Sequence, residues 1–556
     1  MATAGHPELA LVRTLIAALT QALEKALAHA RQLTEGGRGI DEHQVHCERL
    51  AYQATELRAA QELLRYAETQ QEYGQADAVT ASIALAFAAE VTQKFLAAAD
   101  ANLHDYGVTE SFLQETVAAP AVRQAMRAGV AEARLRDIGH FVLATNGANT
   151  IWLGDELAEM TRQSVRDFTR QEVEPIAERI HRNDELAPDD LIAKMGELGY
   201  FAMSIPEAYG GTGMGFLVMI ITTEELSRGS LGAAGSLITR PEIVARALLD
   251  GGTEAQKQRW LPRIASGELM VAVSVTEPDI GSDVASLTCR AEVGELDGRL
   301  GYFVHGAKAW CTFAGRGDLI GLLARTHADP KQGARGLSLF IVEKERFYGH
   351  DFLIQQPHGG TMRGKTDATL GYRGMHSFSI SYENYFVPAE NVIGEAQGLN
   401  RGFYLQMRGF ANGRLQTGGR AVGLAQAALE KSTAYTKSRT QFGRPIGEYQ
   451  LTRYKLGRMA THLAAARQLT YAAARHMQGE ADGGFAAAMA KLLASDVAQW
   501  LTQEGQLLHG GWGYAEETPI SRYVVDALVL PIFEGVKPIL ELKVIARHLL
   551  QDGTTR

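Results

Sequence analysis

The sequence predicts a mainly α-helical protein with a central β-domain. Helical periodicity of apolar residues fills residues 7 to about 140 and 155 to about 267, and it returns after Gly402. Between Met270 and about Val392 it is replaced by short apolar runs bounded by Gly and Pro, which are typical of strands. A chain of 556 residues is also too long for one core. We therefore expect four segments: a helical extension (1–150), a helical domain (151–268), a β-domain (269–395) and a C-terminal helical domain (396–556).

The extension has apolar residues at helical spacing, as at Leu15, Leu19 and Leu23, and the glycines of residues 36–39 separate its first two helices. Ala/Leu periodicity normally reports core packing, so we expect a helical bundle without chemistry of its own. Residues from Ile40 onward match those from Ile446 onward without a gap. The extension is therefore either a degenerate duplicate of the C-terminal domain or an Ala-rich bundle that matches by chance.

The following segments continue the pattern. After Asp155, helical spacing runs through Val165, Phe168 and Val173. Strands are expected within residues 271–275, 302–304, 319–323 and 337–342.

Composition narrows the class of protein. Hydrophobic residues make up 46% and charged residues 21%, as in ordinary globular proteins, and the net charge of -9 disfavours nucleic acid as a partner. Cys47, Cys289 and Cys311 show neither metal-ligand spacing nor an even disulfide set, so we expect no metal and a reducing compartment, the cytoplasm. We expect no membrane span, because no run approaches the ~18–20 apolar residues that a span requires.

Two segments of the β-domain carry candidate chemistry. Residues 275–283 predict a strand followed by a turn, whose backbone amides and hydroxyls of Thr276 and Ser282 suit a phosphate or a flavin edge. Trp310 is able to cover a flavin face, and the Thr312 hydroxyl is able to reach its ring nitrogens. The alternatives are an ordinary turn and a Trp buried in a small sheet.

A third segment places Glu534 between Phe533 and Gly535, after an apolar run. A carboxyl group in apolar surroundings has a raised pKa, which suits it to abstracting a proton near neutral pH. The alternative is a Glu at a helix start that interacts with amide dipoles.

Five motifs in order make the chain resemble the acyl-CoA dehydrogenases over about residues 154–556. They are residues 275–278 (VTEP), 310–312 (WCT), 439–443 (RTQFG), 510–514 (GGWGY) and 533–535 (FEG). The resemblance implies that family's fold: a helical domain, a β-barrel-like domain and a four-helix bundle, here with the extension added. It also implies FAD as cofactor, an acyl-CoA substrate, electron-transfer flavoprotein as electron acceptor and at least a dimer.

The resemblance also implies roles for individual residues. Glu534 would be the catalytic base, with no rival because Gly413 stands where some members carry theirs. The cofactor-binding residues would be Val275, Thr276, Gly281, Ser282, Trp310, Thr312, Gly510 and Gly511, together with Arg439, Gln441 and Phe442 toward the FAD of a second subunit. The substrate-binding residues would be Ser282, Arg240, Phe410, Arg414, Phe533 and Gly535.

Two departures bear on the FAD contacts: Val536 replaces the Thr of the family, and Leu507 replaces a Gln, with Gln506 one place away.

The substrate is less determined by sequence. Arg240 suggests an acyl group that bears a carboxylate, because Arg pairs bidentately with carboxylates. The alternative is that Arg240 faces solvent.

Three other functions compete with this one: an acyl-CoA oxidase of the same fold, another short-chain dehydrogenase and a non-catalytic acyl-CoA-binding scaffold. We also expect the extension to pack where a second dimer sits in tetrameric members of the family. The protein would then be a homodimer.

Overall fold

The structure, a computed structural model, describes residues 6–148, 151–477 and 483–552. It divides into two compact units: residues 1–160 with 417–556 form unit 1, and residues 161–416 form unit 2. The extension and the C-terminal helices thus share unit 1, whereas the second helical segment and the β-domain share unit 2. The expected boundary at residue 150 adjoins residues 149–150, which lie outside the described residues.

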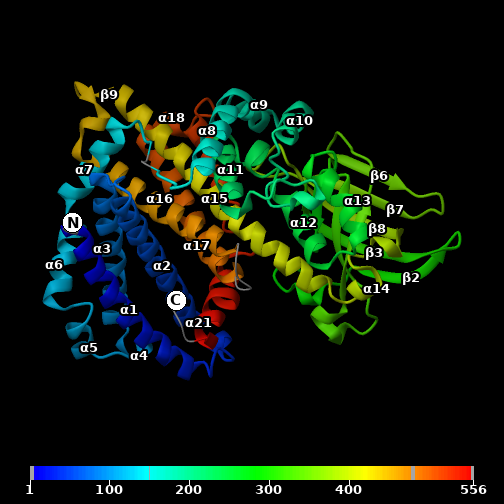
Figure 1. Ribbon diagram of the computed structural model, residues 1–556, viewed down its shortest axis with the longest axis horizontal. Coiled ribbons are helices and arrows are strands. Elements are labelled where there is room, and N and C mark those ends of the chain that lie inside the picture. The colour runs from blue at the N-terminus through cyan, green and yellow to red at the C-terminus, as the bar shows by residue number, and fades with distance from the viewer. Residues whose placement is uncertain (1–5, 149–150, 478–482, 553–556) are drawn as a thin grey trace. The chain divides into compact units, whose positions relative to one another are not determined.

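Unit 1 is helical throughout its described parts apart from one short hairpin (Figure 1). The helices of the extension are α1 (Pro7–Leu33), α2 (Gln44–Glu72), α3 (Ala78–Ala101), α4 (Leu103–Tyr106), α5 (Glu110–Glu115), α6 (Pro120–Gly129) and α7 (Glu132–Ala144). The C-terminal helices are α15 (Gly402–Ser438), α16 (Gln450–Met477), α17 (Gly483–His509), α18 (Gly511–Tyr514), α19 (Pro519–Ala527), α20 (Lys537–Ile539), the π-helix η9 (Leu540–Ala546) and α21 (Arg547–Asp552). The division between the two units falls within α15.

The two halves of unit 1 repeat one another at a fixed spacing in sequence. A 3-10 turn at Ile40–Glu42 precedes α2 just as one at Ile446–Glu448 precedes α16, and both pairs of starting residues are 406 apart. Contacts follow the same repeat: α2 packs on α16, α7 covers α16, and η9 covers α2. The extension therefore packs on the C-terminal helices as a second copy of the same motif.

Glycines and paired charges form this internal interface. A Cβ on Gly139 would lie 1.8 Å from the carbonyl oxygen of Arg453, and one on Gly457 would lie 1.9 Å from that of Leu135, so α7 and α16 touch backbone to backbone. Glu90 pairs with Arg458 at 3.1 Å and with His462 Nε2 at 3.1 Å. These contacts leave no room for side chains at the two glycines.

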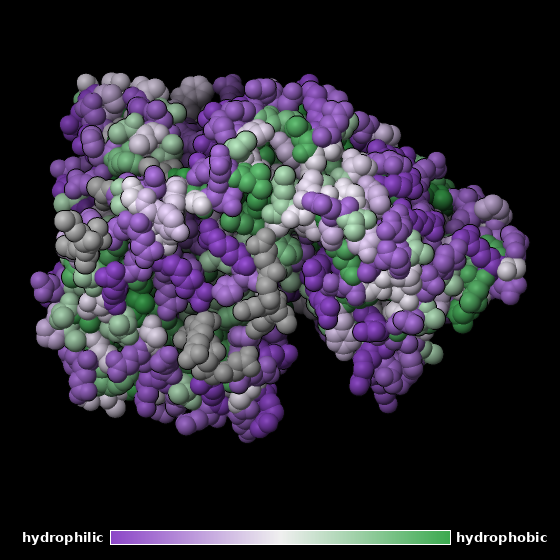
Figure 2. All heavy atoms as spheres, in the orientation of Figure 1, coloured by the Kyte–Doolittle hydropathy of each residue, from purple (hydrophilic) through white to green (hydrophobic). Residues whose placement is uncertain are grey.

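One helix differs from the expectation that no segment is apolar enough to span a membrane. Residues 79–101, within α3, form the one helix among the described residues that is long and apolar enough to cross a membrane. It is mostly buried, against α1, α2, α6 and α16. The face shown in Figure 2 is mainly hydrophilic, with hydrophobic residues in separate groups. The apolar side chains of α3 thus serve as core within the unit.

Unit 2 combines helices with a mixed sheet, as expected. Its helices are α8 (Glu156–Phe168, which begins in unit 1), α9 (Glu174–Asn183), α10 (Asp189–Glu197), α11 (Gly215–Gly229), α12 (Thr239–Gly251), α13 (Glu254–Ala265) and α14 (Glu395–Gly398). Its strands are β1 (Val271–Ser274), β2 (Arg290–Leu296), β3 (Arg299–Thr312), β4 (Leu319–Arg325), β5 (Leu337–Glu343), β6 (Asp351–Gln355), β7 (Thr361–Asp367) and β8 (Ser377–Pro388). They pair in the order β1-β4-β2-β3-β8-β7-β6, with β5 on β4. The mainly helical fold class with a central β-domain is confirmed.

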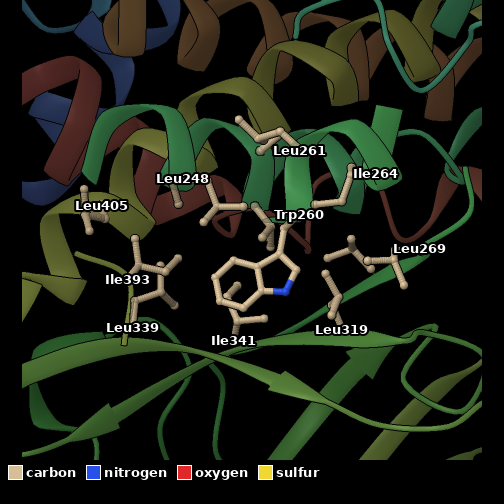
Figure 3. Close-up of a cluster of buried hydrophobic side chains, with 14 of the residues drawn as sticks. Leu248, Trp260, Leu261, Ile264, Leu269, Leu319, Leu339, Ile341, Ile393 and Leu405 are labelled. Atoms are coloured by element: carbon tan, nitrogen blue, oxygen red, sulfur yellow. The ribbon is translucent and has the colours of Figure 1, made fainter. Parts of the chain in front are cut away.

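Helix α13 covers part of this sheet. It begins with a capping box, in which Thr253 Oγ1 accepts from the Gln256 amide and the Gln256 side chain accepts from the Thr253 amide. Its Trp260 is fully buried among Leu319, Leu339 and other apolar side chains (Figure 3). The Trp260 indole donates to Glu343 Oε1 at 3.1 Å, so its polar atom is also satisfied.

Candidate active site

In unit 2, a bulge near the end of β3 presents Trp310. The pairing of β3 with β8 shifts register between Lys308 and Cys311, and Trp310 has a φ of 59° and is 59% exposed. The alternative of a buried Trp is therefore wrong, because the bulge turns the indole out of the sheet. Thr312 lies opposite Ser377 in the ladder, with their hydroxyl oxygens 3.0 Å apart.

A buried ion pair ties this strand to the turn after β1. Lys308, which is fully buried, donates to the Val275 carbonyl at 2.8 Å and to Glu277 Oε1 at 3.1 Å. Glu277 also accepts from the backbone amides of Thr288 (2.9 Å) and Cys289 (2.8 Å). Burial favours the neutral acid, but the Lys308 ammonium and these hydrogen bonds outweigh it and lower the pKa of Glu277. The pair holds β3 against the turn after β1.

The turn itself is open to a ligand. Val275 is buried, Thr276 accepts through its carbonyl from the Ala309 amide at 2.8 Å, and Gly281 and Ser282 are exposed. No heavy atom would lie within 4 Å of a Cβ on Gly281. The backbone at Gly281 and Ser282 is therefore accessible, and its contact with a phosphate or a flavin edge stays a prediction.

Arg240 lies at the start of α12 and is 6% exposed, so the alternative that it faces solvent is wrong. Its Nη1 donates to the Tyr372 hydroxyl at 2.9 Å, and its guanidinium lies 6.0 Å from the centre of that ring. Phe410 and Arg414, on α15, are half-buried.

Glu242, two residues after Arg240 on α12, is a buried carboxyl group. It accepts hydrogen bonds from Ser204 and, at 3.0 Å, from Asn412 Nδ2. Burial raises the pKa of Glu242 although both hydrogen bonds oppose the rise. Sequence inspection offered no signal for this residue beyond its place two positions after Arg240.

In unit 1, four of the predicted FAD residues line one cavity of about 610 Å³: Arg439, Gln441, Gly510 and Gly511. Gly510 has φ 61° and ψ -138°, a conformation that is essentially restricted to glycine. Leu507 also lines the cavity, whereas the Gln506 amide donates to the Gly513 carbonyl at 3.1 Å. The departure from the family Gln therefore places an apolar side chain in the cavity.

Phe442 lies at the tip of the hairpin formed by β9 (Thr440–Gln441) and β10 (Arg444–Pro445). It is 95% exposed, with a φ of 51°. An aromatic ring so exposed is available to a further chain.

Glu534 occupies a turn between α19 and α20, not a helix start. Its φ is 55° and that of Gly535 is 102°, a left-handed pair that costs a non-glycine residue roughly 1 kcal/mol. Fully buried Lys491 donates to the Gly535 carbonyl, and the Arg420 guanidinium lies 4.5 Å from the Phe533 ring centre. The turn is thus anchored from two helices.

Sequence inspection missed the two buried lysines that fix these turns. Lys308 lies inside the strand that carries Trp310, and Lys491 lies in an Ala/Leu-rich stretch of α17. A lysine within an otherwise apolar helical or strand pattern was the available signal, because lysine is seldom fully buried without a partner.

Three family models cover most of the chain. The acyl-CoA dehydrogenase N-terminal domain matches residues 155–268 and the middle domain matches residues 272–385. The C-terminal domain matches residues 400–550 and also residues 1–142. The extension is thereby similar to the C-terminal domain, which agrees with the repeat in unit 1.

Individual relatives agree. The chain is 38% identical to a (2S)-methylsuccinyl-CoA dehydrogenase of Cereibacter sphaeroides, over 96% of each chain. It is 36% identical to an acyl-CoA dehydrogenase of Bacillus subtilis, over 70% of this chain and 97% of that one. The solved glutaryl-coenzyme A dehydrogenase glutaryl-CoA complex is similar with a TM-score of 0.65 and 29% identity, over 74% of this chain and 98% of that one.

Proposed function

Because this chain belongs to the acyl-CoA dehydrogenase family, we propose that it oxidises (2S)-methylsuccinyl-CoA, a short branched thioester with a carboxylate, to mesaconyl-CoA. Family membership makes it an FAD-dependent oxidoreductase that acts on CH-CH groups. The relative that matches nearly the whole chain, extension included, carries that name. The proposal places the reaction in the ethylmalonyl-CoA route of acetate assimilation, in the cytoplasm.

The observation that carries the substrate proposal is the burial of Arg240. A guanidinium presents a rigid fork of donors that matches a carboxylate. The hydrogen bond to Tyr372 holds that fork in one orientation, so less conformational entropy is lost when a carboxylate binds. A neutral acyl chain would gain nothing from such a group.

The residues present fit FAD. In unit 2, the open turn at Gly281 offers backbone amides and the exposed Trp310 indole offers a flat aromatic face. In unit 1, the cavity around Gly510 offers space. FAD, when bound, supplies the acceptor for the β-hydrogen of the substrate and its electron pair. In this proposal Glu534 takes the α-proton, and its backbone amide donates to the thioester carbonyl, which stabilises the developing enolate. The strained turn fixes the Glu534 backbone in place for both tasks.

Anaerobic titration with CoA thioesters tests the substrate. We expect flavin bleaching by methylsuccinyl-CoA at lower concentration than by glutaryl-, isobutyryl- or butyryl-CoA. Preferential bleaching by butyryl-CoA would contradict the assignment and favour another short-chain dehydrogenase.

Replacement of the base tests the chemistry. Glu534→Gln should retain FAD and abolish bleaching, because an amide is unable to accept the α-proton. Retained bleaching would refute the role of Glu534, and a colourless protein that does not take up FAD would favour the scaffold alternative.

Electron-transfer flavoprotein is the proposed acceptor. Turnover that requires this flavoprotein supports the dehydrogenase, whereas rapid peroxide formation without it supports an acyl-CoA oxidase.

We also propose a homodimer. The extension covers the α16 face of the C-terminal helices within one chain, where a second dimer would otherwise pack. Closed two-fold assembly then needs one further interface, to which exposed Phe442 belongs in this proposal. Light scattering should give a mass of two chains, and a tetramer would exclude this role for the extension.

A further inference from the structure

Three potential metal ligands meet in unit 2, apart from the residues assigned above. They are Asp184, which caps the end of α9, His350, which precedes β6, and His376, which precedes β8. One candidate ligand atom from each lies within 4.8 Å of the others. Sequence patterns did not indicate this cluster, because its members lie far apart along the chain, and we had expected no metal.

His376 is the central member of the cluster. Its side chain is 5% exposed. Its Nε2 faces Asp184 Oδ1 at 3.3 Å. The buried ring thus has one nitrogen beside the Asp184 carboxylate and one with no hydrogen-bond partner among the described residues.

His350 completes the group from the exposed side. Its Nδ1 lies 3.2 Å from Thr366 Oγ1, which orients the ring and leaves Nε2 for a ligand. The rings of His350 and His376 are nearly perpendicular, at 81°, with centres 5.0 Å apart.

We propose that Asp184, His350 and His376 bind one divalent transition-metal ion, with solvent in the remaining position. Two imidazoles and a carboxylate suit Zn²⁺ and other divalent first-row transition metals better than Mg²⁺ or Ca²⁺. Metal-ligand bonds of ~2.0–2.1 Å in a tetrahedron place ligand atoms roughly 3.3–3.4 Å apart. The Asp184–His376 pair already has this spacing, and the candidate ligand atoms of all three residues lie within 4.8 Å of one another.

The positive charge of Arg373 opposes the binding of a metal ion. Its Nε lies 3.5 Å from Asp184 Oδ1 and competes with a cation for that carboxylate. It also donates to the carbonyls of Thr369 and His181, so it keeps partners when Asp184 turns to the metal. Removing its charge should therefore tighten metal binding.

The site lies next to the strand ends that position Thr312, a predicted FAD-binding residue. The carbonyl of His376 accepts from the Phe313 amide at 2.8 Å, and the next residue, Ser377, pairs with Thr312. An ion here would fasten the end of α9 to the strand ends that position Thr312.

Calorimetric titration of the full-length, FAD-loaded and chelator-treated protein with Zn²⁺ tests the proposal. We expect one saturable site per chain. His350→Ala, an exposed change that spares the fold, and Asp184→Asn should each weaken Zn²⁺ binding at least ~10-fold, and Arg373→Gln should tighten it. His104→Ala, at a fully exposed histidine outside the cluster, is the matched control and should bind as the unaltered protein does.

Zn²⁺ binding that is absent, or unchanged in His350→Ala relative to the His104→Ala control, would overturn the proposal. If Asp184→Asn lost its FAD or its circular dichroism spectrum, His350→Ala would decide alone.

Discussion

Lys308→Met should destabilise unit 2 and lower its affinity for FAD, because it leaves the buried Glu277 carboxylate without its cationic partner. Lys308 is fully buried and Glu277 is 4% exposed, so water does not replace the lost ammonium. Breaking a buried pair from one side costs about 3–5 kcal/mol. Glu277 keeps the hydrogen bonds from Thr288 and Cys289, which places the expected loss near the lower end, about 3 kcal/mol, or roughly a factor of 100 in the unfolding equilibrium.

Urea unfolding followed by flavin fluorescence measures this loss as a lower midpoint at an unchanged slope. The pair lowers the pKa of Glu277, so its stabilisation is present above the ordinary carboxyl pKa and disappears as pH falls through the lowered value. The difference between the variant and the unaltered protein should therefore shrink in acid.

The double variant Glu277→Gln/Lys308→Met is the matched control, because it removes both charges and should recover part of the loss. A single variant within about 0.5 kcal/mol of the unaltered protein at neutral pH would refute the reasoning, since that is the effect of an ordinary surface change.

Three further changes follow from the same structure. Arg240→Met should lower kcat/KM for methylsuccinyl-CoA roughly 10–100-fold, the value of about 1.5–3 kcal/mol for a hydrogen bond to a charged group, and leave isobutyryl-CoA little changed; equal losses on both would contradict carboxylate recognition. Glu242→Gln should remove a pH dependence of the free energy of unfolding. Because burial raises the pKa of Glu242, the stabilisation from this carboxyl group is fully present at low pH and is lost as pH rises. Thermal unfolding above neutral pH should therefore show the variant to be more stable than the unaltered protein. Gly510→Ala should release FAD during gel filtration, because its conformation costs alanine about 1–3 kcal/mol, whereas Gly298→Ala, at another positive φ with open space around it, should keep FAD.

Sequence periodicity was sufficient to predict the elements, because helices and strands must each turn one face to a core. The β-domain strands and the return of helices at Gly402 were predicted for that reason and are confirmed. Four of the predicted site residues of unit 1 line one cavity, because Arg439 directly follows α15 and Gly510 directly follows α17.

What sequence inspection could not supply was burial between distant segments. Trp310 is exposed because a bulge interrupts β3, and alternation along a strand does not reveal bulges. Lys308 and Lys491 would both be placed outside by their residue type, yet each reaches a carbonyl of a functional turn, Val275 or Gly535. Such contacts depend on the tertiary fold, which a local pattern does not encode.

The repeat in unit 1 shows which properties a duplicated domain kept. Glu90 and Asp496 lie 406 residues apart, the spacing of the repeat. Each lies beside the other copy: Glu90 pairs with Arg458, and Asp496 is a neighbour of Tyr52, which stands 406 residues before Arg458. The packing face is thus retained in both copies. At the same spacing, however, Leu33 stands in place of Arg439, so the extension lacks the charged residue that lines the predicted FAD cavity. A copy that keeps its packing face without the predicted cofactor residues suits a packing partner, which is the role that the homodimer proposal requires.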